Sequence, residues 1–316
     1  MSIPRTTWFA TLITIGRSRA WLWGWGLLLL AAPAGCGGVH VGGFGVGIKG
    51  SGVLKTEERT VAGFSEIDVS GVAKLAWEAQ EEPSLEVTVE DNLLPLLVTE
   101  VTGDTLKIFF KGNVSPTKDV VVKVASPSLN ALRGSGATQS TLSGVKSDNF
   151  KLGLSGSGQC TISGLAKALS VECSGASNLK ADELVAGSTS VRMSGSSSAK
   201  VQAKELRSVH TEGASNVKVR EVNTNDLAIE ASGSSECTVS GQVVKLTVHA
   251  SGAATVHAAG LNAEQVQVEI SGSSSLEVDA VKALAGTASG ASNVRYPGSP
   301  ASQTVRTSGS ASVGKK

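Results

Sequence analysis

The sequence has 316 residues, with 28 lysines and arginines against 27 aspartates and glutamates, and a formal net charge of +1. Arg5, Arg17 and Arg19 are the only charged residues before position 36, so the rest of the chain is slightly acidic. This balance excludes the basic footprint of a nucleic-acid-binding domain. The 37 glycines and the aromatic content of only 4% make the composition unusual for a globular domain.

The first 35 residues predict an export signal. The three arginines are followed by an apolar run over 20–35, which suits a signal-peptide core and is short for a membrane-spanning helix. Ala34-Gly35-Cys36 resembles a bacterial lipobox, with Pro33 where leucine or valine is usual. We therefore expect a signal peptide over 1–35, acylation of Cys36, and a flexible glycine-rich tether over 36–52. A signal peptide cleaved nearby and an uncleaved anchor are the alternatives.

A repeat of about 19 residues organises the chain from position 131 onward. Its marker is a glycine that follows a serine, or once a glutamate, and recurs every 18 to 20 residues. The repeated glycines are Gly136, Gly156, Gly175, Gly195, Gly213, Gly233, Gly252, Gly272, Gly290 and Gly309. The turns alternate along the chain between two sequence classes, Ser-Gly-Ala-Ser-Asn and Ser-Gly-Ser-Ser.

The residues on either side of each glycine alternate between apolar and polar. Nine of the ten residues four positions before the glycine are apolar, as are nine of the ten four positions after it, whereas the position three before is mostly polar. This period of two predicts strands with one buried face, and glycine suits the turn because it adopts positive φ without steric cost. The chain therefore predicts an all-β fold, a right-handed parallel β-helix with coils about 4.8 Å apart.

Residues 53–130 are less regular, and we interpret them as the N-terminal coils and cap of the same solenoid. Alternating segments predict strands within 67–77, 85–89, 106–110 and 119–124, and Ser70-Gly71 reads as an early member of the turn class. The solenoid is expected to span 53–312, with the regular repeats over 131–312. The tail from Pro297 to Lys316 is expected to close the other end, with Lys315 and Lys316 as edge charges.

One stretch resembles a known family. The segment 59–71, Arg-Thr-Val-Ala-Gly-Phe-Ser-Glu-Ile-Asp-Val-Ser-Gly, is similar to the opening of the head GIN domain of auto-transporter adhesins. The segments 90–92 and 98–108 and the paired Gly-Ser-Gly turns are similar to later parts of that domain. The resemblance covers about residues 53–312 and implies a β-helix shaped like the pectate lyases but without their catalytic residues. It also implies a role in adhesion.

The remaining cysteines and the histidines predict structural roles. Cys160 and Cys237 hold the same position four coils apart, about 19 Å, which is too far for a disulfide. Cys173 also faces inward, so all three are expected to be buried thiols that fill the core. A row of alternating charges three positions before the glycines is expected to run along one outer sheet and fix the register of the coils. Its central members are Glu172, Arg192, His210, Glu230, His249 and Glu269.

A second row, five positions after the glycines, carries the candidate site. Lys180, Lys200 and Lys218 follow one another in three successive coils, and stacked like charges cost energy unless a partner offsets them. An acidic surface polysaccharide would do so. The alternative is that the three lysines are solvated and relieved by Asp182 and Glu205.

No enzyme class fits the pattern. The acidic residues are scattered singly rather than stacked as in carbohydrate-cleaving β-helices, and neither a metal-ligand spacing nor a cofactor motif is present. We therefore expect no cofactor and a non-catalytic, exported cell-envelope protein that is membrane-anchored through Cys36 and binds a surface polysaccharide or a matrix protein. A carbohydrate-binding or degenerate polysaccharide-processing β-helix and an envelope spacer are the alternatives, and self-association of the solenoid is plausible.

Overall fold

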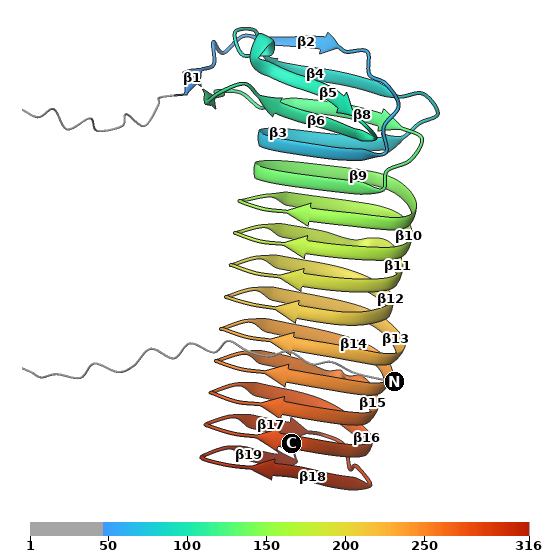
Figure 1. Ribbon diagram of the computed structural model, residues 1–316, viewed down its shortest axis with the longest axis vertical. Coiled ribbons are helices and arrows are strands. Elements are labelled where there is room, and N and C mark those ends of the chain that lie inside the picture. The colour runs from blue at the N-terminus through green and yellow to red at the C-terminus, as the bar shows by residue number, and fades with distance from the viewer. Residues whose placement is uncertain (1–46, 316) are drawn as a thin grey trace, which may run out of the picture. The chain divides into compact units, whose positions relative to one another are not determined.

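The structure, a computed structural model, describes residues 47–315 and consists almost entirely of strands (Figure 1). The one helical element among these residues is the short 3-10 helix η1 (Leu94–Leu96). No helix in this part of the chain is long and apolar enough to cross a membrane. The predicted signal peptide and Cys36 lie outside the described residues.

The body of the fold is a parallel β-solenoid, as predicted. Strand β3 (Glu66–Ala79) pairs in parallel with β9 (Ala131–Leu154), and from β10 to β17 each strand pairs in parallel with the strand before it (Figure 1). The later coils comprise β10 (Gln159–Cys173), β11 (Asn178–Met193), β12 (Ser198–Thr211), β13 (Asn216–Ala231), β14 (Glu236–Ala250), β15 (Thr255–Ile270) and β16 (Ser275–Ala288). The last coil is formed by β17 (Asn293–Tyr296), β18 (Ser302–Thr307) and β19 (Ser312–Lys315).

The repeated glycines stack directly on one another at the turns. Gly195 has a φ of +70° and a Cβ added to it would lie 2.6 Å from the carbonyl oxygen of Gly175 in the preceding coil. Next to the glycine, the amide of Ala176 donates to the carbonyl of Gly156 at 2.7 Å, and the same bond recurs from coil to coil. The turn edge is therefore a hydrogen-bonded ladder in its own right. Gly71 belongs to it, as predicted, because Gly71 pairs with Gly136.

A buried serine closes many of these turns, two positions after the glycine. Ser177, Ser197 and Ser215 donate from Oγ to the carbonyl oxygen three residues earlier, at 3.0, 2.8 and 2.9 Å. Each of these serines is 1% exposed. A buried hydroxyl needs such a partner, so serine here is a part of the turn and not only a small, soluble residue.

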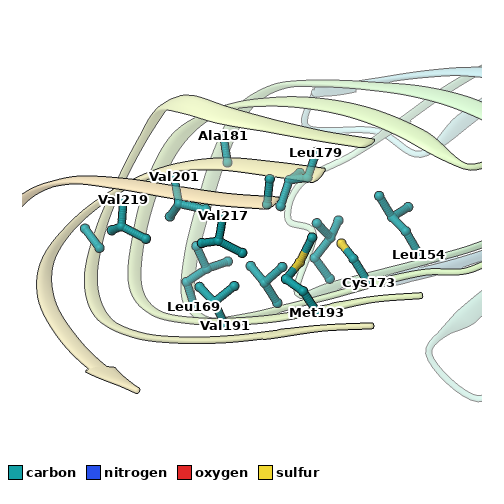
Figure 2. Close-up of a cluster of buried hydrophobic side chains, with 14 of the residues drawn as sticks. Leu154, Leu169, Cys173, Leu179, Ala181, Val191, Met193, Val201, Val217 and Val219 are labelled. Carbon is teal, nitrogen blue, oxygen red and sulfur yellow. The ribbon is translucent and has the colours of Figure 1, made fainter. Parts of the chain in front are cut away.

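The core between the two faces of the solenoid is thin and aliphatic. Side chains of Leu179, Val201 and Val217 project from one side of the coils towards Val191 and Met193 on the other (Figure 2). The register aligns equivalent residues, since Leu179 pairs with Ala199 and Ala199 with Val217. The interior is therefore a stack of identical positions.

The three cysteines take part in this core as free, buried thiols, which confirms the prediction. Burial raises the pKa of Cys173 to about 11 and that of Cys237 to about 12. Burial, with a smaller contribution from Cys173, also raises the pKa of Cys160 well above its ordinary value. All three therefore stay protonated near neutral pH and act as small apolar side chains.

Antiparallel strands cover the N-terminal end of the solenoid. Strand β4 (Ser84–Glu90) pairs antiparallel with β2 (Leu54–Glu58) and with β8 (Val121–Ser126). Strands β5 (Leu97–Thr102) and β6 (Thr105–Phe110) form an antiparallel pair, and β6 and β8 each run parallel to β3. The alternation of residues predicted most of these strands but not their direction. Trp77 of β3 is buried beneath this cap and donates from Nε1 to Oγ of Ser126 at 2.9 Å.

At the other end, the tail adds a final parallel coil. Strand β18 pairs with β16 and β19 pairs with β17, so the repeat continues to residue 315. Lys315 is exposed, as expected of an edge charge, and its Nζ donates to Oγ of Ser299 at 2.7 Å. Lys316 lies outside the described residues.

A buried carboxylate fastens the start of the described chain to the cap. Glu90 is 1% exposed and accepts from the amide of Gly52 at 2.7 Å, from the amide of Thr117 at 2.8 Å and from the Thr117 hydroxyl. Nearby, β1 (Ile48–Lys49) pairs with β7 (Val114–Ser115), and Asn92 donates to the carbonyl of Lys49. Residues 48–52, which the sequence placed in the glycine-rich tether, are therefore bound to the cap.

The stacked turns lead to a first prediction. We expect Gly195→Ala to lower the free energy of unfolding by at least about 1–2 kcal/mol, the cost of a left-handed φ for a residue with a Cβ. The approach to Gly175 O adds to that cost. Gly153→Ala is the matched control, because Gly153 has no positive φ and its nearest neighbour would be the Arg133 side chain at 3.8 Å. Equal urea midpoints for the two variants would contradict the role assigned to the turn.

The buried carboxylate leads to a second prediction. Desolvation acts to raise the pKa of Glu90, but hydrogen bonds from Thr117 and the Gly52 amide outweigh it and hold the pKa below the ordinary value. A lowered folded-state pKa stabilises the fold above the unfolded pKa of about 4.3, and this stabilisation is lost as the pH falls through the folded-state pKa.

We therefore expect Glu90→Gln to unfold at lower urea concentration than the wild type at pH 7, and the difference to shrink below about pH 4. Urea titrations at several pH values measure this. Glu58→Gln, at an exposed position of β2, serves as control. A Glu90→Gln deficit that is the same at every pH would contradict the ionised state of the carboxyl.

Candidate functional site

The strand that follows each turn carries the lysines singled out in the sequence, here called the lysine strip (Lys180, Lys200 and Lys218). They lie on β11, β12 and β13, where Lys180 pairs with Lys200 and Lys200 with Lys218. All three are exposed. The parallel register thus places three ammonium groups in one column, with backbones about 4.8 Å apart.

The acids expected to relieve this column do not do so. Within residues 47–315, none of the three lysines forms an ion pair. Asp182 instead lies 3.8 Å from the guanidinium of Arg220, and Glu205 forms no ion pair in the same part of the chain. The three positive charges of the lysine strip are therefore compensated by solvent alone.

A row of small polar side chains runs beside the lysine strip, two positions earlier in each strand. Gln159, Asn178, Ser198 and Asn216 pair with one another in successive coils. Since side chains two apart on a strand project from the same face, an amide or hydroxyl stands next to every lysine of the strip. Asn216 uses its amide to donate to Glu236 at 2.8 Å. The face therefore offers both charge and hydrogen-bonding groups.

The strand before each turn carries the predicted row of alternating charges on the opposite side of the turn edge. Glu172 pairs with Arg192, and the row continues through His210, Glu230 and His249. Nδ1 of His210 lies 2.8 Å from Glu230, and that of His249 lies 3.2 Å from Glu269. These contacts support the predicted role of the row in holding the coils in register.

One set of ion pairs was not predicted from the sequence. His257 continues the row of the lysine strip two coils beyond Lys218, and it lies 3.7 Å from Glu236 and 3.8 Å from Glu277. Glu236 belongs to the neighbouring row, so the contact runs diagonally between coils. A signal for it was present in the shared spacing from the turn glycine, but the diagonal partner is visible only in the structure.

The described part of the chain has several surface hollows. Two of them lie on the face before the turns, with volumes of about 590 and 430 Å³, and both are lined by His210. A third, of about 730 Å³, lies where the cap meets the first coils. Three charged groups of this third hollow are engaged by the fold: Arg59 donates to Leu97 O at 2.7 Å and to Thr99 at 3.0 Å, and Lys123 pairs with Glu86 at 2.8 Å.

The described residues contain no group of three or more histidine, cysteine, aspartate or glutamate side chains that could hold a metal ion. The ionisable groups on the two faces are either paired along the rows or exposed.

Comparisons with known proteins agree with this architecture. A family model described as "Putative auto-transporter adhesin, head GIN domain" matches residues 63–220 and 205–300. No curated protein matches the chain. A crystal structure of a "putative adhesin" from Parabacteroides distasonis ATCC 8503 is 24% identical, with a TM-score of 0.50 over 84% of this chain and 99% of that one.

Two further crystal structures are less similar in shape. A "putative adhesin" from Parabacteroides merdae ATCC 43184 is 22% identical, with a TM-score of 0.47 over 85% of this chain and 98% of that one. A "putative lipid binding protein" from Parabacteroides distasonis ATCC 8503 is also 22% identical, with a TM-score of 0.45 over 85% and 99%. The family match extends over most of the solenoid and includes the segment 63–71 that first resembled it. The chain belongs to the head GIN domain family.

Proposed function

We propose that this protein is a non-catalytic, exported adhesion module of the cell envelope that binds an acidic surface polysaccharide through the lysine strip. The observation that carries the proposal is the column of Lys180, Lys200 and Lys218, in register and without an acidic partner within the described chain. The family's description as an adhesin head domain and the likeness to a crystal structure described as a "putative adhesin" support the broader role of a surface protein.

The column has an energetic cost that a ligand would remove. Two unit charges about 4.8 Å apart in water repel by about 0.9 kcal/mol, and flexible side chains reduce this value by spreading apart. A chain of anions would convert the repulsion into attraction at each of the three coils. Since the charges are exposed, salt at physiological concentration weakens this attraction, with a screening length of about 8 Å.

The spacing of the column favours a polysaccharide over a peptide. An extended peptide advances about 3.3 Å per residue, so its side chains do not coincide with coils about 4.8 Å apart. A sugar ring in a linear polymer advances by about the height of one coil. A uronic-acid polymer lying along the solenoid axis therefore offers one carboxylate to each lysine, and its hydroxyls meet the neighbouring amide row.

The location follows from the N-terminal sequence. A signal peptide over 1–35 and acylation of Cys36 would tether the solenoid to a membrane through the glycine-rich segment, in the periplasm or at the cell surface. Labelling cells with a clickable fatty acid tests this, and we expect labelling of the wild type and none of Cys36→Ala. Equal labelling of both would contradict the lipid anchor.

The lysine strip is tested by binding of the purified full-length chain to polygalacturonate. We expect the triple variant Lys180→Gln, Lys200→Gln, Lys218→Gln to bind about 3- to 140-fold more weakly, because three exposed ion pairs at roughly 0.2–1 kcal/mol each are lost. The control triple variant Lys111→Gln, Lys151→Gln, Lys245→Gln has the same net charge and leaves the strip intact.

If both triple variants bind polygalacturonate equally, the strip is not the site. If the wild type binds neither this polymer nor an array of glycans and matrix proteins, the protein is a structural spacer of the envelope instead.

A further inference from the structure

Two hollows of about 590 and 430 Å³ follow one another along the face before the turns, and His210 lines both of them. Together they are here called the furrow, which lies on the opposite side of the turn edge from the lysine strip. The first hollow begins at Asp68 on β3, and the second ends at Ser271, just beyond β15. The furrow is thus parallel to the solenoid axis and crosses the strands.

Two rows of side chains form its walls. One wall is the row of alternating charges, three positions before each turn glycine. The other is a row of hydroxyls one position before the glycine, whose members within the furrow are Ser135, Ser155, Ser174, Ser194, Ser232, Ser251 and Ser271. Glu212 takes the place of a serine in one coil. Residues two apart on a strand are about 6.6 Å apart, so one sugar ring of a polymer that lies along the solenoid axis can contact both rows at once.

The charged wall has a gap at Gly153. This residue pairs with Glu172 in the next coil, and Arg133 precedes it in the same row. Because glycine has no side chain, the charged wall is interrupted between Arg133 and Glu172. Gly153 has no positive φ, and a Cβ there would meet nothing nearer than the Arg133 side chain at 3.8 Å. The fold would tolerate a side chain at this position.

The charges around the first hollow nearly cancel. Three carboxylates, from Asp68, Glu172 and Glu212, line it together with the guanidinium groups of Arg133 and Arg192. Glu172 and Arg192 are neighbours in register, yet neither forms an ion pair within residues 47–315. A carboxylate acceptor and a guanidinium donor therefore stand one coil apart and remain available to a ligand. A polyanion gains nothing from this surface.

We propose that the furrow is a second binding site, for a linear, uncharged polysaccharide that lies along the solenoid axis. Each sugar would contact one coil, with its hydroxyls between a serine on one side and a carboxylate or guanidinium on the other. Charged groups paired with hydroxyls form the stronger class of hydrogen bond. The proposal does not depend on the lysine strip, which lies on the other face and selects for negative charge.

The lining also determines how affinity depends on ligand length. No tryptophan, tyrosine or phenylalanine side chain lines the furrow, so it lacks the large aromatic rings on which sugars usually stack and each sugar contributes little. Contacts repeat from coil to coil, so the affinity rises with the number of sugars bound. A single sugar is not retained, whereas an oligosaccharide that covers several coils is.

The test uses the full-length chain with cello-oligosaccharides and chito-oligosaccharides of two to eight sugars, measured by calorimetry. We expect one of the two series to bind, with an affinity that rises with length. Gly153→Trp fills the gap and should weaken binding of the longest oligosaccharide at least tenfold. Thr287→Trp is the matched control, because Thr287 is an exposed member of the same row outside both hollows.

A second variant keeps the proposal testable if Gly153→Trp fails to fold. Glu172→Gln with Arg192→Gln removes both charges and keeps an unbranched polar side chain at each position, and it should also weaken binding. Binding that is unchanged in both variants, or no binding of either series to the wild type, would overturn the proposal. The triple lysine variant distinguishes the two sites, since it should no longer bind polygalacturonate but should still bind the neutral oligosaccharide.

Discussion

The close stacking of the turn glycines is the constraint on which the rest of the structure depends. At each turn the backbone of one coil rests on the backbone of the coil before it, so no side chain can separate them. A Cβ at Gly195 would come within 2.6 Å of the carbonyl oxygen of Gly175, and the amides beside the glycines bond to the preceding coil. The turns therefore fix the register near them, and residues within five positions of a turn fall into columns along the solenoid, whereas the register shifts farther from the turns.

Because equivalent residues form columns, the order of charges along a column determines whether neighbouring coils attract or repel each other. On one face, alternating charges such as Glu230 and His249 follow each other and stabilise neighbouring coils. On the other face, Lys180, Lys200 and Lys218 follow each other without compensation. Both patterns come from the same backbone, so the difference lies in the sequence alone. A column of alternating charges stabilises the fold. A column of like charges lowers the stability of the fold, and a partner of opposite charge can offset that loss.

The sequence predicted those features that the repeat itself encodes. The coil length, the parallel pairing and the columns all follow from the spacing of the glycines, because a parallel register places equivalent residues side by side. The strand direction in the cap could not be predicted, since alternation of apolar and polar residues is the same in parallel and antiparallel strands.

Residues with distant or hidden partners were also missed. Glu90 is a single acid among others in the sequence, and its partners lie 27 and 38 residues away. Serine two positions after each glycine was visible in the repeat but reads as an ordinary turn residue, because burial distinguishes it only in three dimensions. The lysine strip was predicted as a column, whereas the gap at Gly153 became a feature only when its neighbours in space were known.

A surface made of columns favours partners that are themselves repetitive. A single exposed ion pair contributes roughly 0.2–1 kcal/mol, which is too little for specific recognition. Three or more equal contacts along a rigid column combine, because after the first contact the others form within one complex and without further loss of translational freedom. Such a solenoid needs no deep pocket, and it distinguishes polymers by their repeat length and charge. The two faces described here differ in charge and share one repeat length, so they would select different polymers of the same geometry.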